Sequence, residues 1–278
     1  MKKNQLLSLV CAALFFMGCG EKPAGVVDLT VELQENPIGL DEQHPRFGWR
    51  IESDQDDVMQ TSYRIMVAPT KTDLDKAENL VWDSGVVSSD QSTFVPYAGS
   101  QLESRKDYYW KVLITTNKGD SLWSDAAQWS MALLDDGDWQ AQWIGAPGQG
   151  DGPLSPDGTE PPLPAPLLRK SFGVAPGRKV VSARVYVTGL GYFELYLNGE
   201  KVGRDVLAPN QTNYDKRPGL ADCGIPVEDN FREYRVMYVG YDVTDRVRRG
   251  ENVLGAILGN GFYNAKIHWV MAFGSPRF

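Results

Sequence analysis

The sequence is poor in the residues that build metal centres, disulfide frameworks and histidine-dependent active sites. Its 278 residues include two histidines and three cysteines, and Cys223 is the only cysteine that follows Cys19. Zinc cages and disulfide frameworks need several cysteines or histidines, so this composition excludes both. Two histidines also leave little room for a Ser-His-Asp enzyme. We therefore expect no metal and no cofactor.

Positive charge is scarce as well. The chain has 28 Lys and Arg residues against 36 Asp and Glu residues, which gives a net charge of −8 at pH 7. Contact with nucleic-acid phosphates needs a basic face, so we expect no nucleic-acid partner. Hydrophobic residues make up 42% and charged residues 23%, the composition of a globular protein with one large or two medium domains.

The apolar run near the N-terminus is too short to cross a bilayer as a mature helix. It extends over residues 6–17, follows two lysines and fits the hydrophobic region of a secretory signal peptide. Gly18 and Cys19 then match the end of a bacterial lipobox, where a small residue precedes the cysteine that receives diacylglycerol. We predict a lipoprotein signal at 1–18, lipidation of Cys19, a membrane anchor and a location in the cell envelope, in the periplasm or at the cell surface. An ordinary secretory signal with an incidental cysteine is the alternative.

Short strands dominate residues 26–134. Apolar and polar residues alternate with period two in the segments 29–33, 47–51, 63–67 and 108–114. This pattern, with turn residues between the segments, predicts an antiparallel β-sandwich. One short helix is expected between strands, with Thr72 as its N-cap and residues 73–78 as its body.

Glycine and proline make up 12 of the 22 residues at 145–166, and every charged residue there is acidic. No packed element is expected in such a segment. It is either a linker between domains or a long loop within one. Trp139 and Trp143 lie just before it and favour the loop, because we expect their rings to be anchored. The second domain is therefore predicted to cover 138–278.

Strand patterns resume beyond residue 167. Alternating or apolar segments occur at 184–188, 192–197, 236–241 and 251–259. Asn198-Gly199 predicts a hairpin, because a type I′ turn needs positive φ at both central positions. The last segment, 251–259, is small and apolar and is typical of a buried strand. The predicted class is all-β, with a second sandwich of jelly-roll type after the first.

Several short motifs follow one another in a specific order. In the second half they are WQAQWI at 139–144, LRKSF at 168–172, GYFELYLNG at 191–199, the set Pro209, Thr212, Tyr214, Lys216 and Arg217, YDVT at 241–244 and LGNGFY at 258–263. In the first half they are NPIG at 36–39, RFGW at 46–49 and YWKV at 109–112. In this order the second half resembles the N-terminal β-sandwich region of bacterial α-L-rhamnosidases, glycoside hydrolase family 78. The first half resembles the fibronectin type III-like module that precedes that region.

The resemblance implies an enzyme that hydrolyses terminal α-L-rhamnose from glycans or glycosides by inversion. Its catalytic acids would belong to an α/α barrel that follows these sandwiches and is absent from this chain. The chain would then be a non-catalytic part, inactive alone, and its second sandwich would be incomplete at Phe278. Residues 218–236 are an insertion relative to the family. A complete carbohydrate-binding surface lipoprotein without catalysis is the alternative, and a purely structural pair of sandwiches is a third possibility.

Inversion needs one carboxylic acid and one carboxylate about 6.5–9.5 Å apart. Two acidic clusters, 54–57 and 135–138, lie in predicted turns. We interpret both as solvated turns, because Asp is favoured there for local hydrogen bonding. Neither has the spacing of a calcium loop. The sequence therefore predicts no catalytic residue and no metal ligand.

Two loops combine aromatic rings with polar groups, as sugar recognition requires. The first contains Tyr214, Asp215, Lys216 and Arg217, and the second contains Asn260, Tyr263, His268 and Trp269. We predict that these residues contact a rhamnose-containing glycan or glycoside. The alternative for the second loop is packing against the rest of the enzyme, and for His268 it is a structural hydrogen bond.

Overall fold

A computed structural model describes residues 24–146, 164–212, 214, 235–264 and 277–278. The predicted signal, Cys19 and most of the 145–166 segment lie outside these residues. The chain separates into two compact units. One consists of Met1–Glu35, His44–Ser100 and Tyr109–Ala127, and the other of Asn36–Gln43, Gln101–Tyr108 and Gln128–Phe278. Among the described residues, no helix is long and apolar enough to cross a membrane.

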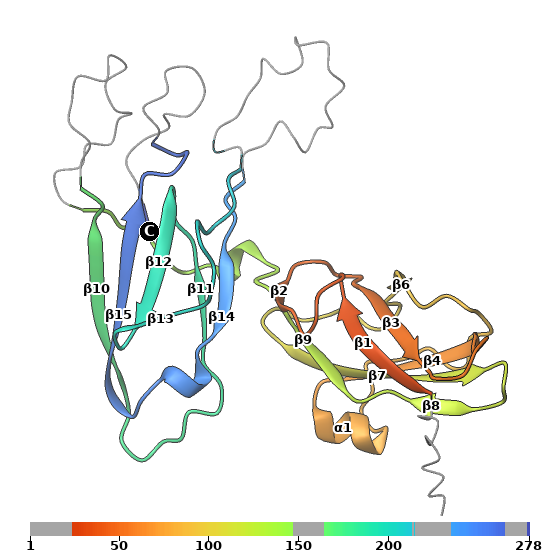
Figure 1. The fold of residues 1–278 in the computed structure, drawn as a ribbon. Coiled ribbons are helices and arrows are strands. Elements are labelled where there is room, and N and C mark those ends of the chain that lie inside the picture. Colours follow the sequence, from red (N-terminus) through yellow and green to blue (C-terminus); the bar gives the residue numbers. More distant parts are fainter. Residues whose placement is uncertain (1–23, 147–163, 213, 215–234, 265–276) are drawn as a thin grey trace, which may run out of the picture. The chain divides into compact units, whose positions relative to one another are not determined.

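Strands between Gly25 and Met131 form two sheets (Figure 1). The first contains, in order, β1 (Gly25–Val31), β3 (Arg46–Glu52) and β6 (Val95–Pro96). The second contains β2 (Ile38–Leu40), β9 (Ala127–Met131), β7 (Asp107–Thr116), β4 (Gln60–Ala68) and β5 (Trp82–Asp83), and β8 (Ser121–Trp123) pairs with β7. The predicted all-β class is confirmed.

The period-two pattern produces the aromatic core of this sandwich. Along β7, half-buried and buried residues alternate over the whole strand. Trp110 and Phe47 are both fully buried, and their ring centroids lie 4.5 Å apart. Trp49 and Tyr63 meet edge to face at 5.4 Å. Burying one such ring is worth roughly 1.5–3 kcal/mol, so these rings stabilise the sheets that carry them.

The single α-helix begins two residues earlier than the sequence pattern predicts. Helix α1 covers Lys71–Lys76, and its N-cap is Thr70, whose hydroxyl accepts a hydrogen bond from the backbone N–H of Asp73. The prediction of Thr72 as N-cap was therefore wrong. Asp73 lies in the first turn and Lys76 in the last, which suits the helix dipole at both ends.

The second unit contains the strands beyond residue 167. A four-stranded sheet has the order β10 (Leu167–Val174), β15 (Gly250–Gly259), β12 (Tyr192–Leu197) and β13 (Glu200–Lys201). A two-stranded sheet pairs β11 (Arg184–Val187) with β14 (Val239–Asp242). The predicted buried strand at 251–259 is β15, which lies between β10 and β12 (Figure 1).

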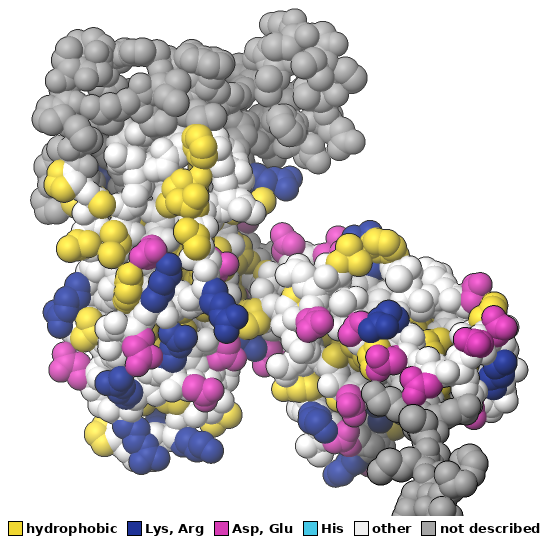
Figure 2. Space-filling model, in the orientation of Figure 1, with side chains coloured by type: hydrophobic (Ala, Val, Ile, Leu, Met, Phe, Trp, Pro, Cys, Tyr) yellow, Lys and Arg dark blue, Asp and Glu magenta, His cyan; other side chains and the backbone are white. Residues whose placement is uncertain are grey.

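The predicted hairpin and the second core are both present. Asn198 and Gly199 have φ of 54° and 87°, and they connect β12 to β13. Phe193, Leu195 and Leu197 point from β12 into a core with Leu258 of β15. The ring of Phe278 packs against this core. Charged side chains of both signs lie among hydrophobic ones on the visible surface (Figure 2), as a water-exposed sandwich requires.

Candidate functional site

The structure describes three of the eight residues predicted to contact sugar. Tyr214 belongs to the first loop, and Asn260 and Tyr263 belong to the second. Asp215, Lys216, Arg217, His268 and Trp269 lie outside the described residues, so their predicted roles stay predictions.

The two predicted loops meet at their tyrosines. The ring centroids of Tyr214 and Tyr263 lie 5.2 Å apart, and the ring planes are 87° from parallel. Burial raises the pKa of the Tyr214 phenol, so this hydroxyl stays protonated at neutral pH. Two perpendicular rings form an apolar corner, against which the C–H face of a pyranose can pack.

A short turn after β15 positions Asn260 and Tyr263. The backbone N–H of Asn264 donates to the carbonyl of Asn260 at 3.1 Å and closes this turn. The Asn264 side chain is 3% exposed, and its Oδ1 has no hydrogen-bond partner among the described residues. Next to it, the rings of Tyr192 and Phe262 meet edge to face at 6.2 Å. We call Tyr192, Tyr214, Asn260, Phe262, Tyr263 and Asn264 the loop cluster.

The loop cluster depends on close contact between two glycine-containing turns. Gly191 has a φ of +108°, and a Cβ on it would lie 2.2 Å from the carbonyl oxygen of Gly259. A Cβ on Gly261 would lie 2.9 Å from the Tyr192 ring. Only glycine allows this approach. The sequence signal was the GYF and GNGFY motifs, but the contact between them was not predicted.

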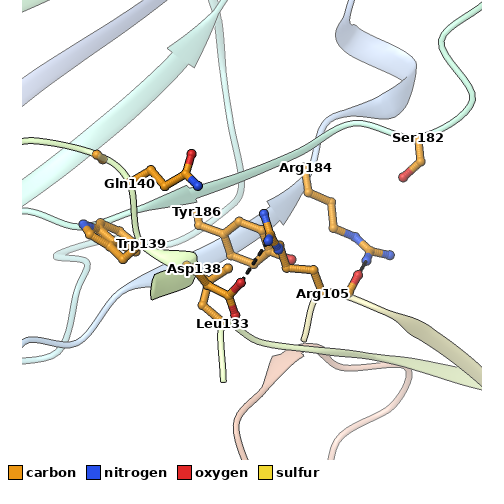
Figure 3. A pocket seen from close by; sticks show the side chains of 9 residues that line it. Arg105, Leu133, Asp138, Trp139, Gln140, Ser182, Arg184 and Tyr186 are labelled. Carbon is orange, nitrogen blue, oxygen red and sulfur yellow. Dashed lines mark hydrogen bonds and ion pairs between the residues drawn. The ribbon is translucent and has the colours of Figure 1, made fainter. Parts of the chain in front are cut away.

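A cavity of about 390 Å³ lies elsewhere in the second unit and was missed by the sequence analysis (Figure 3). Trp139, Tyr186, Arg105 and Asp138 are among the residues that line it. Figure 3 shows Asp138 between Trp139 and Arg105, whose Nη2 donates to the Asp138 carboxylate at 2.9 Å. Hydrogen bonding from Ser104, with the charge of Arg105, lowers the pKa of Asp138.

The charged groups of this cavity already have protein partners. Arg105 pairs with Asp138, and Arg184 pairs with Asp107. Asp138 is thus half-buried and paired, whereas residues 54–57 are exposed, as predicted for a solvated turn. We therefore favour the loop cluster as the ligand site. No group of three or more His, Cys, Asp or Glu residues in the described part of the chain is arranged to hold a metal ion.

The tryptophans before the Gly/Pro-rich segment differ in their environment. The Trp139 ring packs on Tyr238, with centroids 5.4 Å apart, and is anchored as predicted. Trp143 is 48% exposed. The prediction of two anchored rings therefore holds for Trp139 alone among the described contacts.

Two family models match the chain. The Rha78A-like, N-terminal immunoglobulin domain matches residues 26–135, and the alpha-L-rhamnosidase N-terminal domain matches residues 178–222 and 226–274. These matches cover most of both predicted sandwiches.

Known relatives are much longer than this chain. An α-L-rhamnosidase of Formosa agariphila is 35% identical over 99% of this chain and 30% of its own length. One from an Alteromonas strain is 35% identical over 84% of this chain and 23% of its own length. The structure of α-L-rhamnosidase from Dictyoglumus thermophilum has a TM-score of 0.73 and 34% identity over 91% of this chain and 26% of that one. The Streptomyces avermitilis α-L-rhamnosidase complexed with L-rhamnose shares the fold, with a TM-score of 0.74 at 22% identity, over 92% of this chain and 38% of that one.

Proposed function

Because the chain carries the two N-terminal domains of α-L-rhamnosidases, we propose that it is a non-catalytic part of such an enzyme. The enzyme hydrolyses terminal α-L-rhamnose from glycans or glycosides by inversion, with its chemistry in an α/α barrel outside this sequence. The observation that carries the proposal is coverage: the chain spans about 30% of the Formosa enzyme and 26% of the Dictyoglumus one.

The carboxyl groups support a non-catalytic role. A general acid in a glycosidase needs a raised pKa. Among the described residues, every carboxyl whose pKa is clearly shifted has it lowered, by a hydrogen-bonding partner: Glu32, Asp73, Asp83, Asp138 and Glu194. These groups are held ionised by arginine, lysine, serine, threonine or asparagine neighbours. They are suited to structural pairing and not to proton donation.

The loop cluster supports a role in holding the substrate. Perpendicular tyrosine rings offer apolar faces, and the half-buried Asn260 adds an amide group that matches sugar hydroxyls. We propose that this cluster binds a rhamnose-containing glycan or glycoside. With Cys19 acylated, the protein would present this site at the cell envelope.

The catalytic part of the proposal is tested on the purified chain with an aryl α-L-rhamnoside. We expect no release of the aryl group above background. Turnover that disappears when one carboxylate of this chain is replaced would place the chemistry here and overturn the proposal.

The binding part is tested by calorimetry with L-rhamnose. Tyr263→Ala and Asn260→Ala should each weaken binding about tenfold, because each removes one contact type. Phe172→Ala, an exposed aromatic on β10 of the same unit, is the matched control and should bind as the wild type. Equal binding by all four proteins would exclude the loop cluster as the site.

A further inference from the structure

The outer face of the four-stranded sheet carries a hollow at Gly255. On β15, Leu254 and Leu258 point into the core, so Gly255 lies on the opposite face, because strand side chains alternate. Its cross-strand neighbours are Tyr196 on β12 and Arg169 on β10. The three residues therefore form one row across the outer face, with no side chain at its centre.

The hollow has a volume of about 260 Å³ and is mainly apolar. Val253 and Ile257 flank Gly255 along β15, and Leu167 lies beside Arg169 at the edge. A Cβ built on Gly255 would meet only Leu168 O at 3.8 Å and Tyr196 Cβ at 3.9 Å. The space above Gly255 is thus open because no side chain fills it.

The Tyr196 ring beside the hollow is fixed in place. Its hydroxyl donates to Oε2 of Glu194 at 2.7 Å, two residues back on the same face. Lys201 donates to the other oxygen of Glu194, also at 2.7 Å. This hydrogen bond ties the half-buried Tyr196 ring to its i−2 neighbour on the same strand. A fixed aromatic ring loses little conformational entropy when a ligand packs on it.

Arg169 supplies hydrogen-bond donors on the other side of the hollow from this ring. It is exposed, and none of the ion pairs formed by the described residues includes it. A guanidinium carries five N–H donors, and Glu194 nearby is an acceptor. The ring and the apolar hollow match the C–H face of a sugar, and the donors of Arg169 and the acceptor of Glu194 match its hydroxyls.

The same arrangement recurs at the other end of β12. Tyr192 faces Gly259 across the strand pair, as Tyr196 faces Gly255. Tyr196 lies four positions after Tyr192, which is about 13 Å along a strand. Tyr192 also contacts Phe262 of the loop cluster. The face is therefore continuous with the loop cluster and extends away from it along β12.

We infer that the outer face of β10, β15 and β12 binds a saccharide chain, one unit of which sits on Tyr196 in the Gly255 hollow. Further units lead along β12 to the loop cluster. This inference rests on the proposed carbohydrate-binding function. It assigns the recognition of a polymer to the sheet face and the recognition of a single sugar to the loops.

Two variants alter the proposed binding surface on the outer face and leave the residues of the loop cluster unchanged. Gly255→Val fills the hollow, and its new Cβ makes only ordinary contacts in a strand that favours valine. Tyr196→Ala removes the ring. Gly173→Val on β10 is the matched control, because a Cβ there meets nothing within 4 Å. It lies four residues from Arg169, about 13 Å along the strand.

The full chain is run through gels that contain a soluble rhamnose-containing polysaccharide, and its affinity for free L-rhamnose is measured by calorimetry. Gly255→Val and Tyr196→Ala should weaken polysaccharide binding about tenfold and leave L-rhamnose affinity and Tm unchanged. Gly173→Val should match the wild type. This pattern supports the inference.

Three other outcomes overturn it. If both face variants bind polysaccharide as the wild type does while Tyr263→Ala does not, the outer face of the sheet does not bind the saccharide chain. The proposed function of the loop cluster would then still stand. If the wild type binds neither probe, the carbohydrate-binding function fails with the inference. If Gly255→Val dissociates a dimer without changing polysaccharide binding, the face is a contact between protein molecules.

Discussion

Replacing Asn252 by alanine removes a fully buried amide that ties β15 to the turn before it and to the β12–β13 hairpin. Its Nδ2 donates to the carbonyls of Arg248 at 2.7 Å and Gly250 at 3.2 Å. Its Oδ1 accepts from the backbone N–H of Arg248 at 2.8 Å and from Nδ2 of Asn198 at 2.9 Å. Asn198 is also the first turn residue of the hairpin, and its Oδ1 accepts from Val253 N at 2.9 Å.

The magnitude follows from these four bonds. Each is worth about 1 kcal/mol net when formed inside a protein. Arg248 and Gly250 are exposed, so water can replace part of the hydrogen bonding that their backbone groups lose when Asn252 is removed. We therefore expect Asn252→Ala to lower the free energy of unfolding of the second unit by about 2–3 kcal/mol. This corresponds to about 30- to 150-fold more frequent opening.

Hydrogen exchange with mass spectrometry locates the effect. Peptides from β15 and β12 should exchange faster by that factor, and peptides from β3 and β4 should not change. Asn210→Ala, at an exposed asparagine, should stay within about 0.5 kcal/mol of the wild type. Unchanged exchange in β15 of Asn252→Ala would refute the reasoning, because the four bonds would then contribute nothing.

Two further predictions concern the lipid anchor at Cys19 and the ion pair between Glu32 and Arg46. Cys19→Ser should move the protein from the membrane fraction to the soluble fraction and abolish palmitate labelling; a variant that is still labelled contradicts the lipobox. Hydrogen bonding from Arg46 lowers the pKa of Glu32 below its ordinary value of 4.5, so the resulting stability is present above that pH and is lost as the pH falls through the folded pKa. Between about pH 5 and about pH 3, the free energy of unfolding measured with denaturant should therefore fall more steeply for the wild type than for Glu32→Gln. Parallel curves for the two proteins would mean that the ion pair contributes nothing to stability.

Local patterns in the sequence were enough to predict the elements that depend on neighbouring residues. The alternation at 192–197 became a strand whose buried residues face one core. Asn198-Gly199 formed the predicted turn, because its two positive φ values are a property of the dipeptide itself. The α1 cap shows the limit of this approach. Thr70 and Thr72 are both residue types that suit an N-cap, and the cap is Thr70, two residues after β4 ends at Ala68.

Contacts between distant segments could not be predicted in the same way. Tyr214 and Tyr263 were each predicted from their own loop, but their contact requires the strands that hold both loops. The cavity lined by Arg105 and Tyr186 combines part of the WQAQWI motif with residues far from it in the sequence, so the motif alone did not predict it. Asp138 looked like a residue of a solvated turn, because its partners Ser104 and Arg105 lie far away in the sequence.

Gly191 shows how one residue connects such distant parts, and it yields a last prediction. It has a φ of +108°, and a Cβ would lie 2.2 Å from Gly259 O and 3.0 Å from Asn260 O. Gly199→Ala is the matched control, because φ there is +87° but nothing lies within 4 Å. The control should lose only about 1–2 kcal/mol of stability, because its new side chain adds left-handed backbone strain and no contact with other atoms.

Gly191→Ala must in addition displace the turn that carries Asn260 and Tyr263, because backbone oxygens cannot yield as a flexible side chain can. We expect it to destabilise the second unit by at least about 1 kcal/mol more than Gly199→Ala. It should also weaken L-rhamnose binding about tenfold, while Gly199→Ala binds normally. Equal affinities in calorimetry would mean that the position of the turn is irrelevant to the ligand, and the loop cluster would then no longer be a credible sugar site.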